Sequence, residues 1–210
     1  MTKIKLCGLM RQQDIAVANA LQPEYVGFVF APKSRRYVTP ERVREWRGTL
    51  SKEIRAVGVF VDAPVEEIAA CLTEGIIDMA QLHGHETGEQ ILTLQKLTGK
   101  PIIKAFSVES PQDIAAACAC EADYVLLDSG KGGTGNSFDW SLLKEMNRPY
   151  FLAGGLNPEN VERALCQCSP FAVDVSSGIE TDGVKDAEKM KRFVIKVREK
   201  RDREAGEDHE

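Results

Sequence analysis

Short apolar runs alternate with amphipathic segments along nearly the whole chain. Eight of these runs are rich in Val, Ile, Leu and Phe, and each is followed by a polar turn and a segment with helical periodicity. They are IKLC (4–7), YVGFVF (25–30), AVGVFV (56–61), MAQLHG (79–84), PIIKAF (101–106), YVLLDS (124–129), YFLAGG (150–155) and FAVDVSSG (171–178). The alternation predicts repeated strand–helix units whose parallel strands are buried on both faces.

The spacing of the strand ends indicates a closed barrel. Successive ends recur every 22 to 31 residues, a length that a strand, a helix and two short loops consume. Eight such units, joined by right-handed crossovers, fit an α/β fold with a single domain, a (β/α)8 TIM barrel over residues 1–200. A doubly wound open sheet is the alternative. The charged residues 201–210 have no apolar face and are expected to fray.

Three of the predicted helices begin with a capping residue followed by proline, at Thr39-Pro40, Ser110-Pro111 and Asn157-Pro158. The side-chain oxygen of the cap accepts a free backbone N–H, and proline in the first turn has no N–H to leave unpaired. The last predicted helix covers residues 186–200.

The charge balance narrows the classes of partner. Lys and Arg total 27 against 32 Asp and Glu, so the formal net charge is −5, which argues against a general surface for nucleic acid or anionic membrane. The longest uncharged run has ten residues, about half of what a spanning helix needs, and the N-terminus lacks the apolar stretch of a signal peptide. We therefore expect a cytoplasmic protein.

The six cysteines are expected to be reduced thiols in such a compartment. Two C-x-C pairs, Cys118/Cys120 and Cys166/Cys168, lack the C-x-x-C spacing and the nearby histidine that zinc ligation favours. No metal site is predicted.

Reactive and small residues occur where strands end, which is the end of a barrel that carries chemistry. Cys7 ends the first strand and Asp128 the sixth. Gly154-Gly155 and Ser176-Ser177-Gly178 end the seventh and eighth, where barrels commonly hold a phosphate on backbone N–H groups. Taken alone, Cys7 could be an inert buried thiol and Asp128 a turn former. The two small-residue segments could likewise be an ordinary turn, for Gly154-Gly155, and a helix cap, for Ser176-Ser177-Gly178. Together they predict a site for a phosphate ester.

Several blocks of the sequence resemble the phosphoribosylanthranilate isomerase family of tryptophan biosynthesis, over residues 3–197. They are KLCGLMR, GFVFAPKSRRYV, VGVFV, QLHG, LLDS followed by GGTGNSFDW, LAGGLNPENV and FAVDVSSGIE-x-x-G-x-KD. Their order and spacing agree with the barrel. Met10 departs from the family, which usually has Thr there.

The resemblance implies an Amadori rearrangement of N-(5-phosphoribosyl)anthranilate to 1-(2-carboxyphenylamino)-1-deoxyribulose 5-phosphate, without a cofactor. The family's general acid falls on Asp128, which would protonate the furanose oxygen so that the ring opens to a protonated Schiff base. Its general base falls on Cys7, which would then take the proton from C2′. Its arginine for the anthranilate carboxylate falls on Arg36. Its phosphate loops fall on Gly154, Gly155, Ser176, Ser177 and Gly178.

These roles set physical requirements. A free thiol is mostly protonated at neutral pH, so Cys7 needs a nearby cation. Strand alternation places Lys5 on the face of Cys7, and Asp174 on the face of Ser176, and the first and eighth strands are neighbours in a barrel. We therefore predict a Lys5–Asp174 ion pair inside the barrel, with its ammonium favouring the thiolate. Asp128 has to stay protonated near neutral pH, through burial or nearby negative charge.

Some alternatives stay open. Arg35 competes with Arg36, because orientation decides which guanidinium faces the pocket. His83 is as consistent with a structural histidine and receives no catalytic role. A histidine-pathway aminoaldose isomerase is expected to carry a carboxylate where this chain has Cys7, and a non-catalytic sugar-phosphate-binding barrel is the other alternative. Monomer and homodimer both stand, and the glycine-rich segment 130–137 is expected to move when ligand binds.

Overall fold

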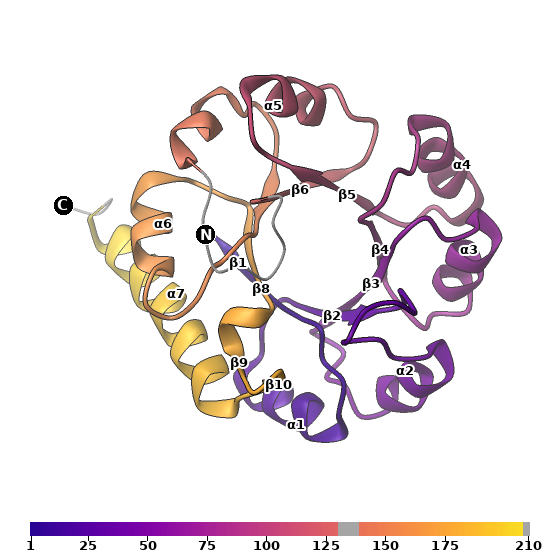
Figure 1. Ribbon diagram of the computed structural model, residues 1–210. Helices are drawn as coiled ribbons and strands as arrows, with labels where there is room; N and C mark the ends of the chain where they lie inside the picture. The colour runs from indigo at the N-terminus through magenta and orange to yellow at the C-terminus, as the bar shows by residue number, and fades with distance from the viewer. Residues whose placement is uncertain (130–138, 208–210) are drawn as a thin grey trace.

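Eight parallel strands close into a barrel in which each strand pairs with its neighbour along the chain and β8 returns to β1 (Figure 1). The computed structural model describes residues 1–129 and 139–207, with backbone alone for 201–207, so the segment 130–137 lies outside the described residues. The strands are β1 (Lys3–Cys7), β2 (Tyr25–Val29), β3 (Arg55–Phe60), β4 (Met79–Leu82), β5 (Ile102–Ser107), β6 (Tyr124–Asp128), β7 (Tyr150–Leu152) and β8 (Ala172–Val175). The predicted TIM barrel is confirmed.

Helices surround the barrel and face it with their apolar sides. They are α1 (Gln12–Leu21), α2 (Pro40–Arg47), α3 (Val65–Thr73), α4 (Gly88–Thr98), α5 (Pro111–Cys118), α6 (Val161–Gln167) and α7 (Ala187–Glu207), with the 3-10 helices η1 (Trp140–Glu145) and η2 (Ser177–Ile179). Between β6 and β7 the described residues form only η1, where the repeat predicts a full helix. A two-stranded hairpin, β9 (Glu180–Thr181) and β10 (Val184–Lys185), follows η2.

Two of the three predicted caps are confirmed. Thr39 and Ser110 are the residues before α2 and α5. Thr39 Oγ1 accepts the backbone N–H of Arg42, whereas the Asp113 carboxylate accepts both the hydroxyl and the backbone N–H of Ser110. The prediction at Asn157 is wrong, because α6 begins at Val161 after Asn160. The Oδ1 atom of Asn157 accepts the N–H groups of Glu159 and Asn160, which closes a turn ahead of the helix.

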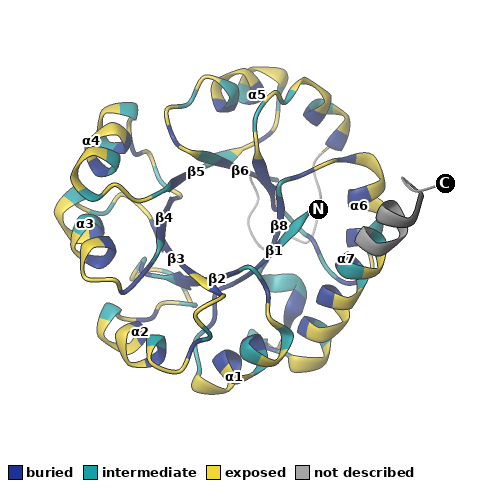
Figure 2. Cartoon of the chain, turned by 180° about the vertical axis from the view of Figure 1, so that it is seen from behind, coloured by how far each residue is buried: buried dark blue, intermediate teal, exposed yellow. Residues whose placement is uncertain are grey.

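The strands of the barrel are mostly buried, and the helices around them are buried along the side that faces the strands (Figure 2). The alternation of side chains along the strands creates two separate cores. The outer core packs residues such as Ile4 and Leu6 against the helices. The inner core fills one end of the barrel and is built from Tyr25, Val57, Met79, Ile103, Leu126, Phe151, Ala153 and Ala172. At the other end several inward positions carry polar side chains, among them Cys7, Gln81 and Asp128, and this difference places the site.

The final helix α7 continues to Glu207, beyond the predicted limit of residue 200. Fraying of residues 201–210 stays a prediction. No helix in the described ranges combines the length and the apolar character that crossing a bilayer requires.

Candidate active site

A cavity of about 600 Å³ opens at the carboxyl ends of the strands. It is lined by Cys7, Val29, Ala31, Ser34, Arg35, Arg36, Val59, Val61, Gln81, His83, Asp128, Ala153, Gly154, Gly155, Leu156, Asp174, Ser176 and Ser177. All the predicted site residues except Gly178 are among them, and Gly178 directly follows Ser177. The volume is in the range of small-molecule sites.

Cys7 is the last residue of β1 and is buried against β2. The register pairs it with Gly27, and a Cβ added at Gly27 would lie 2.6 Å from its sulfur. Glycine at this position therefore makes the space that the thiol occupies. Sequence reasoning missed this residue, although a glycine within a strand is a signal of close approach.

The predicted ion pair inside the barrel is confirmed. Lys5 and Asp174 are register partners on β1 and β8, and the Lys5 Nζ atom lies 2.9 Å from Asp174 Oδ1. The effect on Cys7 is smaller than expected. Burial raises the pKa of the Cys7 thiol above its ordinary value, and although the Lys5 ammonium acts in the opposite direction, burial prevails. Lys5 therefore favours the thiolate, as predicted, but by less than burial disfavours it.

Asp128 ends β6 across the cavity from β1. Its Oδ1 atom accepts the backbone N–H of Ser129 at 2.6 Å, whereas no residue in the described part of the chain donates a hydrogen bond to Oδ2. That second oxygen lies 3.9 Å from His83 Nε2. One carboxylate oxygen is thus held by the chain while the other is available to a ligand.

His83 lines the cavity beside Asp128 and was given no role from the sequence. The protein around it lowers the pKa of the imidazole by desolvation, against the opposing charge of Asp128. Its Nδ1 atom lies 3.0 Å from Gln81 Nε2, and the Gln81 Oε1 atom has no partner among the residues that the structure describes. Gln81 is inward-facing at the cavity floor and was not singled out from the sequence.

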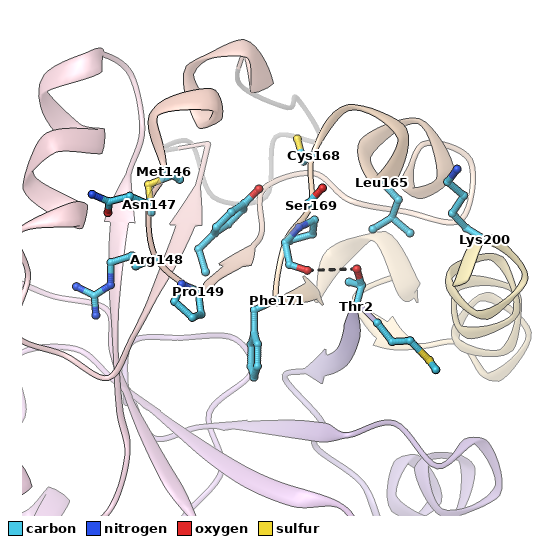
Figure 3. Close-up of a pocket in the computed structure, with 13 residues that line it drawn as sticks. Thr2, Met146, Asn147, Arg148, Pro149, Leu165, Cys168, Ser169, Phe171 and Lys200 are labelled. Atoms are coloured by element: carbon cyan, nitrogen blue, oxygen red, sulfur yellow. Dashed lines mark hydrogen bonds between the residues drawn. The ribbon is translucent and has the colours of Figure 1, made fainter. Parts of the chain in front are cut away.

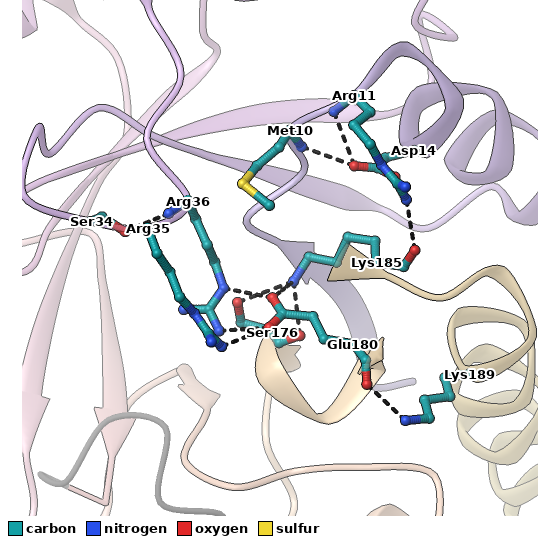
Figure 4. Close-up of polar contacts among 10 residues, drawn as sticks. All are labelled: Met10, Arg11, Asp14, Ser34, Arg35, Arg36, Ser176, Glu180, Lys185 and Lys189. Carbon is teal, nitrogen blue, oxygen red and sulfur yellow. Dashed lines mark hydrogen bonds and ion pairs between the residues drawn. The ribbon is translucent and has the colours of Figure 1, made fainter. Parts of the chain in front are cut away.

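Arg36 is the guanidinium that is enclosed, because its side chain is 18% exposed and that of Arg35 is 61% exposed. Its Nε and Nη2 atoms bond the two carboxylate oxygens of Glu180 at 2.6 and 2.9 Å (Figure 4). Arg35 Nη2 and Lys185 Nζ reach the same carboxylate at 2.8 and 2.7 Å. Sequence reasoning did not find Glu180 or Lys185.

The loops after β7 and β8 lie directly against each other. Gly154 and Gly155 have φ angles of 86° and 64°, in the region that favours glycine. A Cβ added at Gly178 would lie 1.9 Å from the carbonyl oxygen of Leu156, so only glycine fits there. The Ser176 hydroxyl accepts a 3.3 Å bond from Lys185 Nζ. Small residues thus let two backbone segments border the same side of the cavity.

A second cavity, of about 710 Å³, lies at the opposite end of the barrel (Figure 3). Its Arg148 donates to the backbone carbonyls of Ala117 in the last turn of α5 and of Cys120 and Ala122 after it. Thr2 Oγ1 donates to the Pro170 carbonyl at 3.2 Å. These bonds join chain segments, and barrels carry chemistry at the other end. The cavity beside Cys7 and Asp128 is the candidate site.

The chain is similar to known proteins over almost its whole length. The family model described as N-(5'phosphoribosyl)anthranilate (PRA) isomerase matches residues 4–196. The N-(5'-phosphoribosyl)anthranilate isomerase of Thermoanaerobacter sp. (strain X514) is 44% identical over 204 residues, which cover 94% of this chain and 98% of the relative.

Solved structures show the same likeness. The crystal structure of phosphoribosyl anthranilate isomerase from Thermus thermophilus is 36% identical, covers 94% of this chain and 99% of its own, and superposes with a TM-score of 0.86. A crystal structure of such an isomerase in complex with reduced 1-(o-carboxyphenylamino)-1-deoxyribulose 5-phosphate is 35% identical, with the same shares covered and a TM-score of 0.83.

Proposed function

Because the chain belongs to the N-(5'-phosphoribosyl)anthranilate isomerase family, we propose that the cavity beside Cys7 and Asp128 is where its substrate rearranges. The enzyme converts N-(5-phosphoribosyl)anthranilate into 1-(2-carboxyphenylamino)-1-deoxyribulose 5-phosphate, a step of tryptophan biosynthesis. The family match favours this reaction over a histidine-pathway isomerase and over a non-catalytic barrel. One observation supports the assignment of roles, namely that a thiol and a carboxyl group from β1 and β6 line one cavity.

Asp128 is the general acid. With Oδ1 held by Ser129, the Oδ2 atom of this cavity-lining residue gives a proton to the furanose oxygen. The C1′–O4′ bond then breaks, and the anthranilate nitrogen supplies the electron pair that forms the protonated Schiff base. Proton transfer from a positioned carboxyl group contributes about 10² to 10⁴ in rate.

Cys7 is the general base that removes the C2′ proton. Burial raises the pKa of its thiol, which disfavours a resting thiolate. The cation that forms when the ring opens lies next to the sulfur and, with the Lys5 ammonium, favours loss of the thiol proton to solvent in the open cavity. The base is therefore generated within the complex. Removal of the C2′ proton gives an enolamine, which tautomerises to the ketone.

The two anionic ends of the substrate bind on different loops. Arg36 binds the anthranilate carboxylate, since a planar guanidinium matches a planar carboxylate with two parallel hydrogen bonds. The backbone N–H groups of Gly154, Gly155, Ser176, Ser177 and Gly178 bind the phosphate, with glycine allowing its close approach.

These roles can be tested with freshly prepared N-(5-phosphoribosyl)anthranilate, whose fluorescence is lost as the enzyme converts it. Cys7→Ser and Asp128→Asn are each expected to lower kcat by about 10² to 10⁴ while retaining substrate binding. A variant of either residue with near wild-type kcat would refute its assignment. Arg36→Met is expected to raise KM first, and Arg35→Met is its matched control. If KM rises more in Arg35→Met than in Arg36→Met, the carboxylate-binding role belongs to Arg35.

A further inference from the structure

We propose that Glu180 is a positioning residue that aims Arg36 at the carboxylate of the substrate. Its carboxylate holds one edge of the Arg36 guanidinium, so that the other edge is presented to the cavity. The inference rests on the proposed role of Arg36 as the carboxylate-binding residue and identifies what orients it.

The contact uses one specific edge of the guanidinium. Nε and Nη2 of Arg36 donate to Oε1 and Oε2 of Glu180 at 2.6 and 2.9 Å, which is a side-on bidentate pair. A guanidinium has five N–H groups, so three remain, two on Nη1 and one on Nη2. No residue in ranges 1–129 and 139–200 accepts a hydrogen bond from Nη1. These remaining groups form an end-on fork that can bind a second carboxylate while Glu180 stays in place.

Glu180 is itself fixed by the hairpin on which it lies. Its side chain is 4% exposed, and its register partner across β9 and β10 is Lys185, whose Nζ atom bonds Oε1 at 2.7 Å. Asp182 and Gly183 connect the strands with φ angles of 52° and 79°, as in a tight turn with positive φ at both central residues. Lys189 Nζ also bonds the Glu180 backbone carbonyl at 2.7 Å. The carboxylate therefore has little freedom to leave Arg36.

The charges favour a positioning role over competition with the ligand. Hydrogen bonds from Arg36 and Lys185 outweigh burial and lower the pKa of Glu180, so its carboxylate stays ionised. Arg35 bonds the same carboxylate, and these two guanidiniums already exceed its single charge. The surplus positive charge attracts an incoming anion without displacement of Glu180.

The same group of residues connects the two anion-binding loops. Besides bonding Glu180, Lys185 Nζ donates to the backbone carbonyl and hydroxyl of Ser176 at 2.8 and 3.3 Å (Figure 4). Glu180 therefore relates the position of Arg36 to the phosphate loop. This fixes the distance between the sites for the two ends of the substrate.

Calorimetric binding of two probes tests the proposal. One is reduced 1-(o-carboxyphenylamino)-1-deoxyribulose 5-phosphate, and the other is its phenylamino counterpart without the carboxylate. Glu180→Gln is expected to raise the Kd of the first about tenfold, as for loss of one charged hydrogen bond, and that of the second less than about twofold. KM for the substrate rises with the Kd of the first probe, with kcat nearly unchanged. A lower or unchanged Kd for the first probe would show that Glu180 competes with the ligand or has no role, and would overturn the inference.

Glu86→Gln is the matched control, since Glu86 is also a buried carboxylate, with its side chain 2% exposed and paired to Lys104 at 2.9 Å. It is expected to alter stability and leave the ratio of the two Kd values unchanged. If Glu180→Gln fails to fold, Glu180→Asp, which withdraws the carboxylate by one methylene, must show the same selective loss.

Arg36→Met separates the two claims. If it leaves the preference for the carboxylate-bearing probe intact, the proposed role of Arg36 fails. If it removes that preference and Glu180→Gln does not, only the role of Glu180 fails. The double variant is expected to match Arg36→Met alone, because Glu180 acts through that residue.

Discussion

The two ends of the barrel interior are built from the same eight strands but hold opposite kinds of side chain. At the amino ends, the rings of Tyr25, Tyr124 and Phe171 surround Phe151 with centroid distances of 5.4, 5.8 and 5.6 Å. At the carboxyl ends, inward positions carry a thiol, a carboxyl group, an imidazole and an amide around a cavity. The first end fills space and the second leaves it open.

The difference shows how a barrel can hold groups whose burial does not stabilise the fold. The aromatic rings at the amino ends bury apolar surface in close contact with one another, and this burial stabilises the fold in proportion to the area buried. At the carboxyl ends, the buried Cys7 thiol, the Gln81 oxygen that has no partner among the described residues, and the Lys5–Asp174 pair contribute little to stability or reduce it. Stability and chemistry therefore depend on different positions of the same strands, and variants at the two ends should separate them.

Lys5→Met is expected to have the largest effect, because it leaves the Asp174 charge without its partner in the interior. Loss of one member of a buried pair costs about 3–5 kcal/mol of unfolding free energy. Chemical denaturation measures this cost, and the double variant Lys5→Met/Asp174→Leu should recover most of it. Equal destabilisation in the double variant would mean that the pair does not account for the loss.

Gly27→Ala is expected to lower kcat by about 10²-fold, since the added Cβ displaces the sulfur of Cys7 by a fraction of its diameter. Gly58→Ala is the control, because its Cβ meets Ile77, Phe30 and Phe60 in the outer core. It should lower the melting temperature and leave kcat near wild type. Similar kcat losses in both variants would show that the effect is general disturbance of the barrel.

Phe151→Leu sharpens the comparison from the other end. It removes the three ring contacts and is expected to cost about 1–3 kcal/mol of stability. Steady-state kinetics at a temperature where the variant is fully folded should give unchanged kcat and KM. A fall in kcat that accompanies the loss of stability would show that packing at the amino ends also determines catalysis at the carboxyl ends.

The smallest effect concerns the pH at which Cys7 ionises. Because burial raises its pKa, the thiol form is the one that the folded state favours, so Cys7 supports folding at low pH and this support is lost as pH rises through the folded-state pKa. Alkylation of Cys7, followed by site-resolved mass spectrometry, should have its midpoint above pH 9.0, the ordinary value. The Lys5→Met variant should move it higher. A midpoint below 9.0 would show that the charge of Lys5 outweighs burial.

Many of the side chains at the carboxyl ends of the strands can be placed from period-two alternation in the sequence. Parity along β1 and β8, with the closure of the barrel, suffices to predict that Lys5 meets Asp174. The enclosure of Arg36 does not follow, because Arg35 and Arg36 differ only in how a loop orients them. The pKa of Cys7 does not follow either, since it depends on a balance between burial and charge.

Glu180 was missed for a related reason. Its partners come from the loop after β2 and from its own hairpin, and no local pattern in the sequence relates these segments. The Asp182-Gly183 dipeptide is a hairpin signal that could have located the turn and therefore the facing pair of Glu180 and Lys185. The start of α6 was misplaced because the side chain of Asn157 bonds the backbone ahead of the helix.

The contact between Lys5 and Asp174 joins residues that are 169 positions apart, across the seam where the last strand meets the first. Six strands separate β1 from β8 along the chain, so β8 is synthesised long after Cys7. The surroundings of the Cys7 thiol are therefore incomplete until β8 exists and has paired with β1. The cavity beside Cys7 takes its final form only when the barrel closes.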